Sequence, residues 1–485
     1  MFGFLKRIKN AKPTQLSAAA VPVRFVRGRY DAATTTTDNR RHWANADGLS
    51  ADAAASPDVR RTLRNRARYE VANNSYAKGI VLTLANDVVG TGPRLQMLTD
   101  NPCANRIVEK EFMAWAQAVR LAEKLRTMRM AKAQDGEGFC IMTFNEMVYC
   151  PVQLDLKLVE ADQVTSPNLL YPVPNEVDGI VYDRFGNPTE YHVLAEHPGG
   201  RTYGFPKAAK RIPADAMIHW FRADRPGQSR GVPDITPALP LFAQLRRYTL
   251  AVLGAAETAA DFAGVLYTDA PANGEADAIE PMDVIELEKR MLLTMPGGWK
   301  MGQVKAEQPS TTYGEFKKEI LNEIARCLNM PFNVAAGNSS GYNYASGRLD
   351  HQTYFKSIRV EQAELNVVVL DRIFEAWLQE AVLIEGLLPQ ELRMIDADCT
   401  HQWFWDGHEH VDPQKEANAQ DTRLQNNTTT LADEYAKRGL DWETQLRQRA
   451  KEKALMKELG LTEAEAAPKP VQEEVEEDVE ERQAA

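Results

Sequence analysis

Apolar positions repeat at helical spacing along an Ala-rich segment in the middle of the chain. From Leu241 they recur every three or four residues, and the stripe comprises Leu241, Leu245, Tyr248, Val252, Ala255, Ala259 and Phe262. This period predicts an amphipathic helix whose stripe is buried against a partner. Thr236 and Pro237 can begin the helix, although Pro240 favours regular helix only from that point. An ordinary core helix would explain the pattern by itself.

Two more apolar stripes follow downstream. The first predicts a helix that begins at Thr311 or Thr312 and ends near Pro331, and its members are Phe316, Ile320, Ile324 and Leu328. The second lies between Arg348 and Glu385, where proline and glycine are absent, and its members are Ile358, Leu365, Val369, Phe374 and Trp377. The Asn, Ser and Gly-rich segment between them lacks the ending of a phosphate-binding loop. We expect two long helices joined by a projecting loop to form a hairpin.

The N-terminal half mixes helical and strand patterns. Ser56, Pro57 and Asp58 predict a helix start, and the helical pattern continues, with a break near Gly79, toward Gly90. A second amphipathic helix carries Val108, Phe112 and Trp115, and the segments GFCIMTF and QLDLKLV are typical of strands. VDGIVYDRFGNPTEYHVL predicts two strands around a turn at residues 185 to 188. The result is an α+β region through about residue 310.

The C-terminal part is helical and clearly punctuated. Asp412 and Pro413 predict one helix start, and two later helices end at Gly439 and Gly460. Thr430 with Asp433 begins the second, and Asp441 with Glu443 begins the third. Residues 461 to 485 hold 2 Lys and Arg against 9 Asp and Glu, and this repulsion predicts disorder.

Composition limits the function classes. The 485 residues suggest about three structural units. Because no run of about 18 apolar residues occurs, we expect no membrane-spanning helix. Five cysteines without a C-x-x-C spacing indicate neither a disulfide framework nor a zinc ribbon, and favour a reducing compartment.

Charge is unevenly distributed around a net of −11. Residues 1 to 70 hold 14 Lys and Arg against 6 Asp and Glu, and Arg60, Arg64 and Arg68 form a basic ridge on the first helix. Such a ridge could bind DNA, but rows of charge on helices more often pair with acids or face solvent. The remainder is acidic, so we expect weak binding to duplex DNA.

One cluster has metal-ligand residue types. His401, His408 and His410 lie near Asp406, Glu409 and Asp412, and could serve a metal-dependent phosphoesterase or nuclease. The aromatic residues 403 to 405 between them instead favour a strand and a turn. No G-x-S-x-G elbow or dinucleotide-binding pattern is present. We therefore expect no catalytic residue, metal or cofactor, and keep the histidine cluster as the alternative.

Four segments, in the same order, resemble the lambda-type bacteriophage portal proteins. They are RPGQSRGVPDITPAL, YEVANNSYAKGIVLTLANDVVGTGPRL (Tyr69 to Leu95), GYNYASGRLD (Gly341 to Asp350) and WFWDGHEHVDPQKEANAQ (Trp403 to Gln420). Together they extend the resemblance over roughly residues 30 to 460. Four segments in register are far more specific than any one of them.

The resemblance implies a portal-like α+β fold with a mixed wing, a stem hairpin of long helices, a short clip and a helical crown. The expected divisions are a flexible arm at 1–57, the wing at 58–310, stem helices at 311–330 and 348–385, the clip at 331–347, wing return strands at 386–411, the crown at 412–460 and a disordered acidic tail at 461–485. A tunnel loop is expected to interrupt the second stem helix between Arg359 and Asn366, where the sequence itself shows no break.

The implied function is structural and not enzymatic. A ring of copies, expected to be a dodecamer, would form the channel at the unique vertex of a tailed-phage or prophage head. Terminase would package double-stranded DNA through it, and neck proteins, the major capsid protein and the scaffolding protein would contact it, first in the host cytoplasm and then in the virion. Candidates to face DNA are Arg359, Gln362 and Asn366; candidates to face the terminase large subunit are Asn338, Ser339 and Asn343. An acidic channel wall would let DNA slide.

Overall fold

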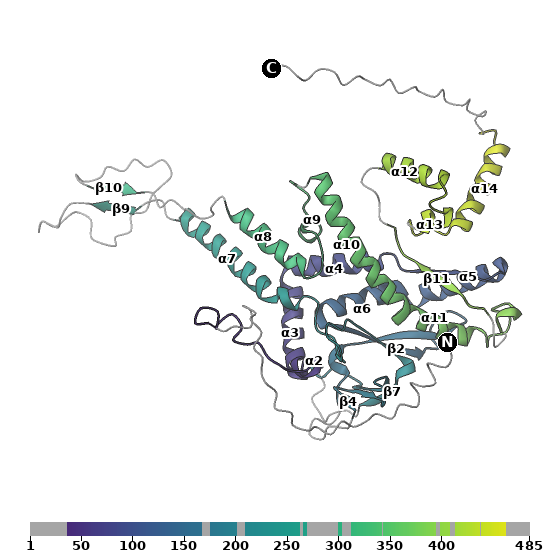
Figure 1. Ribbon diagram of the computed structural model, residues 1–485, viewed down its shortest axis with the longest axis horizontal. Coiled ribbons are helices and arrows are strands. Elements are labelled where there is room, and N and C mark those ends of the chain that lie inside the picture. The colour runs from purple at the N-terminus through teal and green to yellow at the C-terminus, as the bar shows by residue number, and fades with distance from the viewer. Residues whose placement is uncertain are drawn as a thin grey trace, which may run out of the picture. The chain divides into compact units, whose positions relative to one another are not determined.

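The computed structural model describes residues 36–166, 175–200, 209–261, 265–268, 299–302, 312–341, 343–393, 398–407, 413–436 and 438–461 (Figure 1). Contacts divide the chain into two units, Met1–Ser50 and Ala51–Ala485, and the second holds the helices and strands named below. Across the described ranges, no helix combines the length and apolar character needed to span a bilayer. The predicted mixture of helices and strands is confirmed.

The N-terminal helices begin and end at side-chain caps and turns. After the short helix α2 (Ala51–Ala54), α3 spans Pro57–Asn73 and α4 spans Ser75–Val89. The break predicted near Gly79 is wrong, because the chain turns at Asn74 and Gly79 lies inside α4. Asn74 is extended, and its side-chain oxygen accepts hydrogen bonds from the backbone N–H groups of Tyr76 and Ala77. Asparagine favours this capping position, whereas an isolated glycine is tolerated within a helix.

Two small sheets follow. One has the order β3 (Leu154–Val159), β2 (Glu137–Phe144), β8 (Met217–Phe221), and all its pairs are antiparallel. The other has the order β4 (Glu176–Val177), β5 (Ile180–Tyr182), β6 (Pro188–Val193), β7 (Lys210–Pro213). The predicted hairpin at residues 185 to 188 is confirmed by the β5–β6 pairing. Asp183 holds this turn by accepting hydrogen bonds from the N–H groups of Phe185 and Asn187.

An aromatic cluster joins helices and strands that are distant in sequence. Phe112 lies on α5 (Pro102–Ala118), Phe374 and Trp377 lie on α11 (Asp371–Ala381), and Trp403 lies on β11 (His401–Phe404). The ring centre of Phe112 is 5.7 Å from that of Phe374 and 5.3 Å from that of Trp377. Strand β11 also pairs with β1 (Arg94–Met97). These contacts join elements from the N-terminal and C-terminal parts of the chain in one core.

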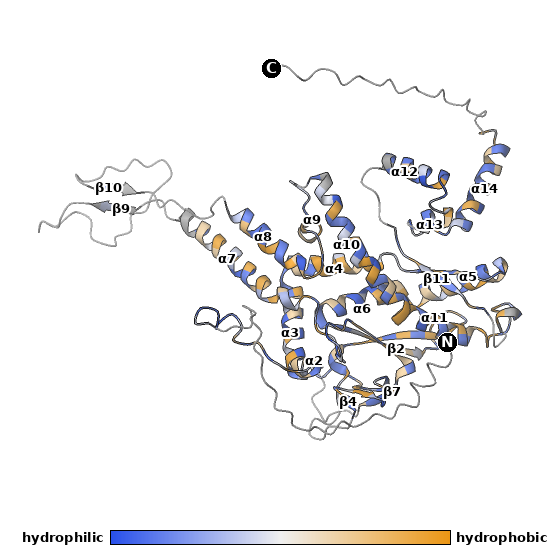
Figure 2. Cartoon of the chain, viewed as in Figure 1, coloured by the Kyte–Doolittle hydropathy of each residue, from blue (hydrophilic) through white to orange (hydrophobic). Residues whose placement is uncertain are grey.

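The Ala-rich helix α7 spans Leu239–Asp261 and follows a 3-10 turn at Thr236–Ala238, so the delayed start is confirmed. Leu245 is buried, and the Tyr248 ring packs 5.0 Å from that of Phe316 on α8 (Tyr313–Arg326). Figure 1 shows α7 and α8 side by side, and in Figure 2 apolar positions recur along α7 beyond its buried end. Leu250 and Leu253 there are 61% and 54% exposed. The side chain of Ala259 and residue Phe262 lie outside the described part.

The packing of α8 differs from the predicted hairpin. Between α7 and α8 the chain contains the ladder of β9 (Val265–Thr268) and β10 (Trp299–Gly302), and α8 packs against α7 and against α9 (Phe332–Ala336). The helix α10 (Tyr344–Leu365) instead packs on α4, where the Tyr354 hydroxyl donates to Asp87 over 2.6 Å. A π-helical segment, η5 (Asn366–Leu370), connects α10 to α11.

The remaining elements are helices and 3-10 turns. The helix α6 (Leu121–Asp135) follows α5, and 3-10 turns occur at Ala161–Gln163, Ala214–Ala216 and Gln390–Arg393. The three predicted C-terminal helices are confirmed as α12 (Pro413–Gln425), α13 (Leu431–Ala436) and α14 (Trp442–Glu458). Asp441 caps α14 and also accepts a hydrogen bond of 2.7 Å from Gln96 on β1.

Candidate functional sites

The basic ridge of α3 is turned into the protein. Arg60 and Arg64 are only 1% and 4% exposed, and Arg68 is partly covered. Acidic side chains from other elements surround them, and the pairs are Arg60 with Asp178, Arg64 with Glu137 and Asp162, and Arg68 with Asp135, Glu160 and Asp162. The interpretation of this ridge as a DNA-binding face is therefore wrong, because the guanidinium groups form ion pairs inside the protein.

Arg230 and Glu137 form the centre of this group, which we call the buried charge network: Arg60, Arg64, Arg68, Arg230, Asp135, Glu137, Asp162 and Asp178. The Arg230 Nη2 atom is 2.7 Å from Glu137 Oε1, and both side chains are fully buried. Burial alone would raise the pKa of Glu137, but the charge of Arg230 and hydrogen bonds from His219 and Arg230 hold it well below its usual range. Glu137 is therefore a fixed negative charge.

Two glycines allow the loop that carries Arg230 to pack closely against the turn between α6 and β2. A side chain at Gly231 would place its Cβ 2.1 Å from the carbonyl oxygen of Gly136, and Gly136 itself has a φ of +92°. The backbone N–H of Gly231 also donates to Glu137 over 3.1 Å. The close approach brings Arg230 to its carboxylate partner, so this part of the RPGQSRGVPDITPAL segment is explained by packing.

His219 completes the centre of the network without being a catalytic group. Its ring stacks on Phe139 at 4.2 Å and on Phe221 at 4.4 Å, and its Nε2 atom lies 3.0 Å from Glu137 Oε2. Burial lowers the pKa of His219, although Glu137 opposes that shift. A neutral ring that donates to a buried carboxylate positions that carboxylate and leaves no exposed atom for chemistry.

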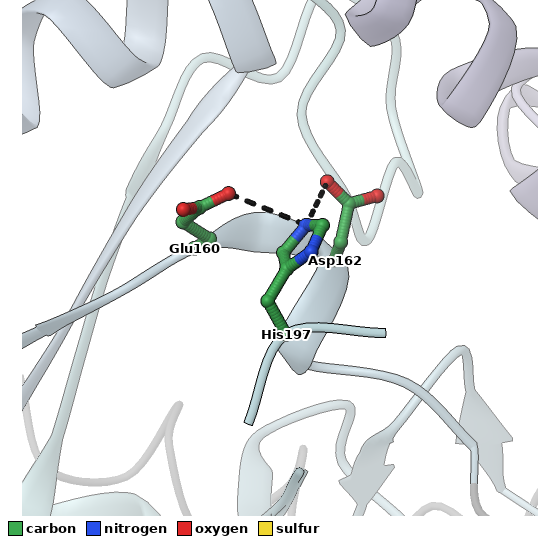
Figure 3. Close-up of side chains that lie close together, drawn as sticks. All are labelled: Glu160, Asp162 and His197. Atoms are coloured by element: carbon green, nitrogen blue, oxygen red, sulfur yellow. Dashed lines mark hydrogen bonds and ion pairs between the residues drawn. The ribbon is translucent and has the colours of Figure 1, made fainter. Parts of the chain in front are cut away.

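Glu160, Asp162 and His197 form a group of metal-ligand type that sequence reasoning missed (Figure 3). The His197 Nε2 atom is 3.3 Å from Glu160 Oε2 and 3.4 Å from Asp162 Oδ2. Arg68 already lies on the same carboxylates, with 2.7 Å between its Nη1 atom and Asp162 Oδ2. A divalent cation would have to displace this guanidinium, so the group is better described as part of an ion-pair cluster. The three residues carry no local spacing signal that could have revealed it.

The predicted histidine cluster is only partly described. His401 lies on β11, where its Nδ1 atom contacts the Cys399 carbonyl oxygen at 2.8 Å and its Nε2 atom contacts Asp371 at 3.2 Å. His408 and His410 lie outside the described residues, as do Glu409 and Asp412. Asp406 accepts a hydrogen bond of 2.7 Å from the Thr91 hydroxyl. The described members, His401 and Asp406, therefore join this segment to α11 and to the turn after α4.

The predicted DNA-facing residues occupy one helical run but differ in their surroundings. Arg359 is exposed on α10. Gln362 is buried and donates to the Val88 carbonyl oxygen over 3.0 Å. Asn366 begins η5 and accepts a hydrogen bond of 3.1 Å from Trp405. Their role toward DNA stays a prediction.

The predicted terminase-facing residues lie in the connection between α9 and α10. Asn338, Ser339 and Asn343 are all exposed there. The Asn338 side chain accepts a hydrogen bond from the Ser340 N–H over 2.9 Å. The exposure of the three side chains is compatible with a partner, and the identity of that partner stays a prediction.

Comparison with known proteins gives one consistent result. The sequence model of the family described as phage portal protein, lambda family, matches residues 37–362. The probable portal protein of Halomonas phage phiHAP-1 is 26% identical over 432 residues, which cover 82% of this chain and 81% of that protein. Portal protein B of Escherichia phage lambda is 23% identical over 487 residues, with coverages of 87% and 88%.

Among solved structures, the chain is similar to one in the neck of a native gene transfer agent particle, computed with C12 symmetry. The TM-score is 0.43 at 14% identity, and the match covers 79% of this chain and 94% of that one.

Proposed function

We propose that this chain, which belongs to the lambda family of phage portal proteins, assembles into a closed ring of twelve copies around a channel for double-stranded DNA. The family is a structural component of the phage head, and the enzymatic alternative finds no support in it. In this proposal, terminase moves DNA through the ring during packaging. Neck, capsid and scaffolding proteins contact its outer surfaces.

The observation that carries the ring is the uncovered apolar face of α7. Leu250 and Leu253 are three residues apart on the helix and both are largely exposed, whereas Phe242 and Leu245 in the first half of the same helix are buried. Apolar rows of this kind are typical of surfaces that another chain covers. If the covering surface is a different face of an identical copy, the contact is head-to-tail and can close into a ring.

We propose that α7 and α8 form the stem hairpin of the portal. The contact between Tyr248 and Phe316 and the β9–β10 ladder support this placement. The division predicted from sequence used 311–330 and 348–385 as the stem and 331–347 as the clip, and shares only α8 with this proposal. The remaining divisions are kept: an arm at 1–57, a wing that includes 386–411, a crown at 412–460 and an acidic tail at 461–485.

Arg359 stays our candidate to face DNA, because its side chain is exposed on α10. Gln362 and Asn366 would face DNA only if their hydrogen bonds to Val88 and Trp405 were broken. Asn338, Ser339 and Asn343 stay candidates to contact the terminase. Cysteines placed at Arg359 and at Gln362 and crosslinked to packaged DNA should react at Arg359 alone.

Electron microscopy of the purified chain tests the ring directly. At micromolar concentration we expect closed rings with a central hole, whose rotational symmetry can be counted in class averages. Particles that remain compact monomers at high concentration would contradict the proposal. The variant Leu250→Asp should shift particles toward monomers, and Phe185→Asp, in an exposed turn far from α7 in sequence, is the matched control.

A further inference from the structure

A cavity of about 400 Å³ opens between α6, α8 and α10. We call it the basic groove, and its charged lining comprises Arg129, Lys132, Arg222, Arg326, Lys356, Glu361 and Glu364. Glu364 pairs with Lys132, and Arg222 pairs with Asp234. The two cations at its floor are buried and neutralised, since Arg129 Nε lies 2.8 Å and Lys132 Nζ lies 3.1 Å from Glu361 Oε1. The floor is therefore balanced in charge.

The mouth of the basic groove is not balanced. Arg326 at the end of α8 and Lys356 on α10 are exposed, and neither has an ion pair with any residue that the structure describes. Val360, one turn after Lys356, is 64% exposed beside them. The mouth thus combines two free positive charges with an uncovered apolar side chain.

A second surface has the opposite character. The end of β2 and the turn that leads to β3 expose Phe144, Met147 and Tyr149 by 63%, 88% and 103%. Glu146 is exposed between them and, within the described ranges, has no ion pair. We call these four residues the hairpin tip.

The hairpin tip is held in an ordered turn. The Asn145 N–H donates to the Gln153 carbonyl oxygen over 2.9 Å, and the Asn145 side chain bonds to Met147 N–H and to Asp155. Because the backbone is fixed, exposing three large apolar side chains is a property of the fold and not of a frayed end.

We infer that the hairpin tip of one copy of this chain binds the basic groove of the next copy in the ring. Glu146 would lie between Arg326 and Lys356, and Met147 and Tyr149 would cover Val360. Opposite charges meet, and both surfaces lose exposed apolar area. The tip and the groove share no residue, so the contact is head-to-tail, as ring closure requires. This inference rests on the proposed function.

The size of the contact is consistent with one part of a larger interface. Each aromatic side chain can bury about 150–250 Å², whereas a stable interface buries about 800 Å² on each partner. The hairpin tip therefore supplies only part of the buried area of the interface, and other exposed apolar side chains such as Leu250 supply more of it.

Crosslinking of mixed single variants tests the contact. Met147→Cys and Val360→Cys proteins are prepared separately as full chains, mixed under ring-forming conditions and treated with a short bis-maleimide. A dimer band should form in the mixture at least tenfold above either variant alone. Phe185→Cys mixed with Val360→Cys is the control, since Phe185 is also largely exposed, at 73% against 88% for Met147, but lies outside the tip. The native exposed Cys103 gives the common background.

Charge reversal gives an independent readout. Glu146→Arg and Lys356→Glu should each raise the concentration needed for half assembly about tenfold, and the double variant should recover most of that loss. Thermal unfolding of each monomer serves as the folding check and should stay close to the parent.

The outcomes distinguish failure of the contact between tip and groove from failure of ring formation. If rings form and neither crosslinking nor charge reversal distinguishes the tip from the Phe185 control, this inference is wrong and the ring stands. If no rings form under any condition, the proposed function fails and the inference falls with it. Reversal variants that keep ring formation but lose binding to another head protein would assign the tip to that protein and overturn the inference.

Discussion

The buried charge network and the basic groove use the same residue types in opposite ways. In the network, Arg60 and Arg64 point inward and meet carboxylates that come from other parts of the chain. At the groove mouth, Arg326 and Lys356 point outward and meet none among the described residues. Basic residues on helices therefore belong to the buried interior in one region and to an uncovered surface in the other. The difference lies in what the rest of the fold brings to it.

The largest difference in stability between the two regions is expected when the central carboxylate of the buried charge network is removed. Glu137→Ala leaves Arg230 and Arg64 buried without their main partner, and breaking a buried pair costs about 3–5 kcal/mol of the free energy of unfolding. Urea unfolding followed by tryptophan fluorescence measures it. The control is Asp58→Ala, which removes an exposed pair with Arg61 and should change the free energy by at most about 0.5 kcal/mol. Equal effects of the two variants would mean that the network contributes no more than a surface pair.

Acid should weaken the network through His219. Burial lowers the pKa of His219 in the folded state. Below about pH 6.5 His219 therefore binds a proton in the unfolded chain more readily than in the folded chain. The free energy of unfolding should then fall as pH falls, by up to about 1.4 kcal/mol between pH 6.5 and 5.5. His219→Gln should flatten this slope, and His42→Gln, at an exposed position, should not. An unchanged slope in His219→Gln would contradict the assignment.

Glu109 is a partly buried carboxylate that forms no ion pair with any described residue, although the charge of Arg106 favours its ionised form. Burial raises its pKa to about 7, the Met97 N–H opposes this, and Asp441 and Glu443 add to it. A raised folded pKa gives stability that is complete below the unfolded pKa near 4.3 and is lost as pH rises through about 7. Glu109→Gln should therefore raise the free energy of unfolding at pH 8, by about 1 kcal/mol, and have less effect at pH 5. Lower stability of this variant at pH 8 would show that Glu109 is held charged.

The smallest expected effect concerns Glu160, Asp162 and His197. With Arg68 on the carboxylates, zinc at a few times the protein concentration should change the free energy of unfolding by less than about 0.5 kcal/mol. Arg68→Ala removes the competing charge and should make the three residues respond to zinc in a chelator-reversible way. A clear stabilisation of the parent protein by zinc would mean that zinc displaces the Arg68 guanidinium from the carboxylates.

Local patterns predicted local structure well. The Asp183 turn, the three C-terminal helices and the late start of α7 each depend on a few neighbouring residues, and each agrees with the structure. Tertiary partners could not be read in the same way. The spacing of Arg60 and Arg64 fixes a common face, but Glu137 and Asp178 reach that face only through the fold.

The pairing of helices shows the same limit. The apolar stripe through Tyr248 predicts a buried face but does not show that α8 packs against it. The stripe on α10 likewise does not show that α4 is its partner. The π-helical segment left no signal in the spacing, because the steps from Val369 to Ile373 and from Leu370 to Phe374 keep the four-residue spacing of a regular helix.

The segment η5 holds one residue more than a regular helix would need over the same length. Its i→i+5 hydrogen bonds make the backbone turn by less than the roughly 100° per residue of a regular helix, so the extra residue is absorbed within the segment. The helices on its two sides therefore stay in register with each other. Deleting one residue of η5 should leave Trp377 against Phe112 and Tyr354 bonded to Asp87.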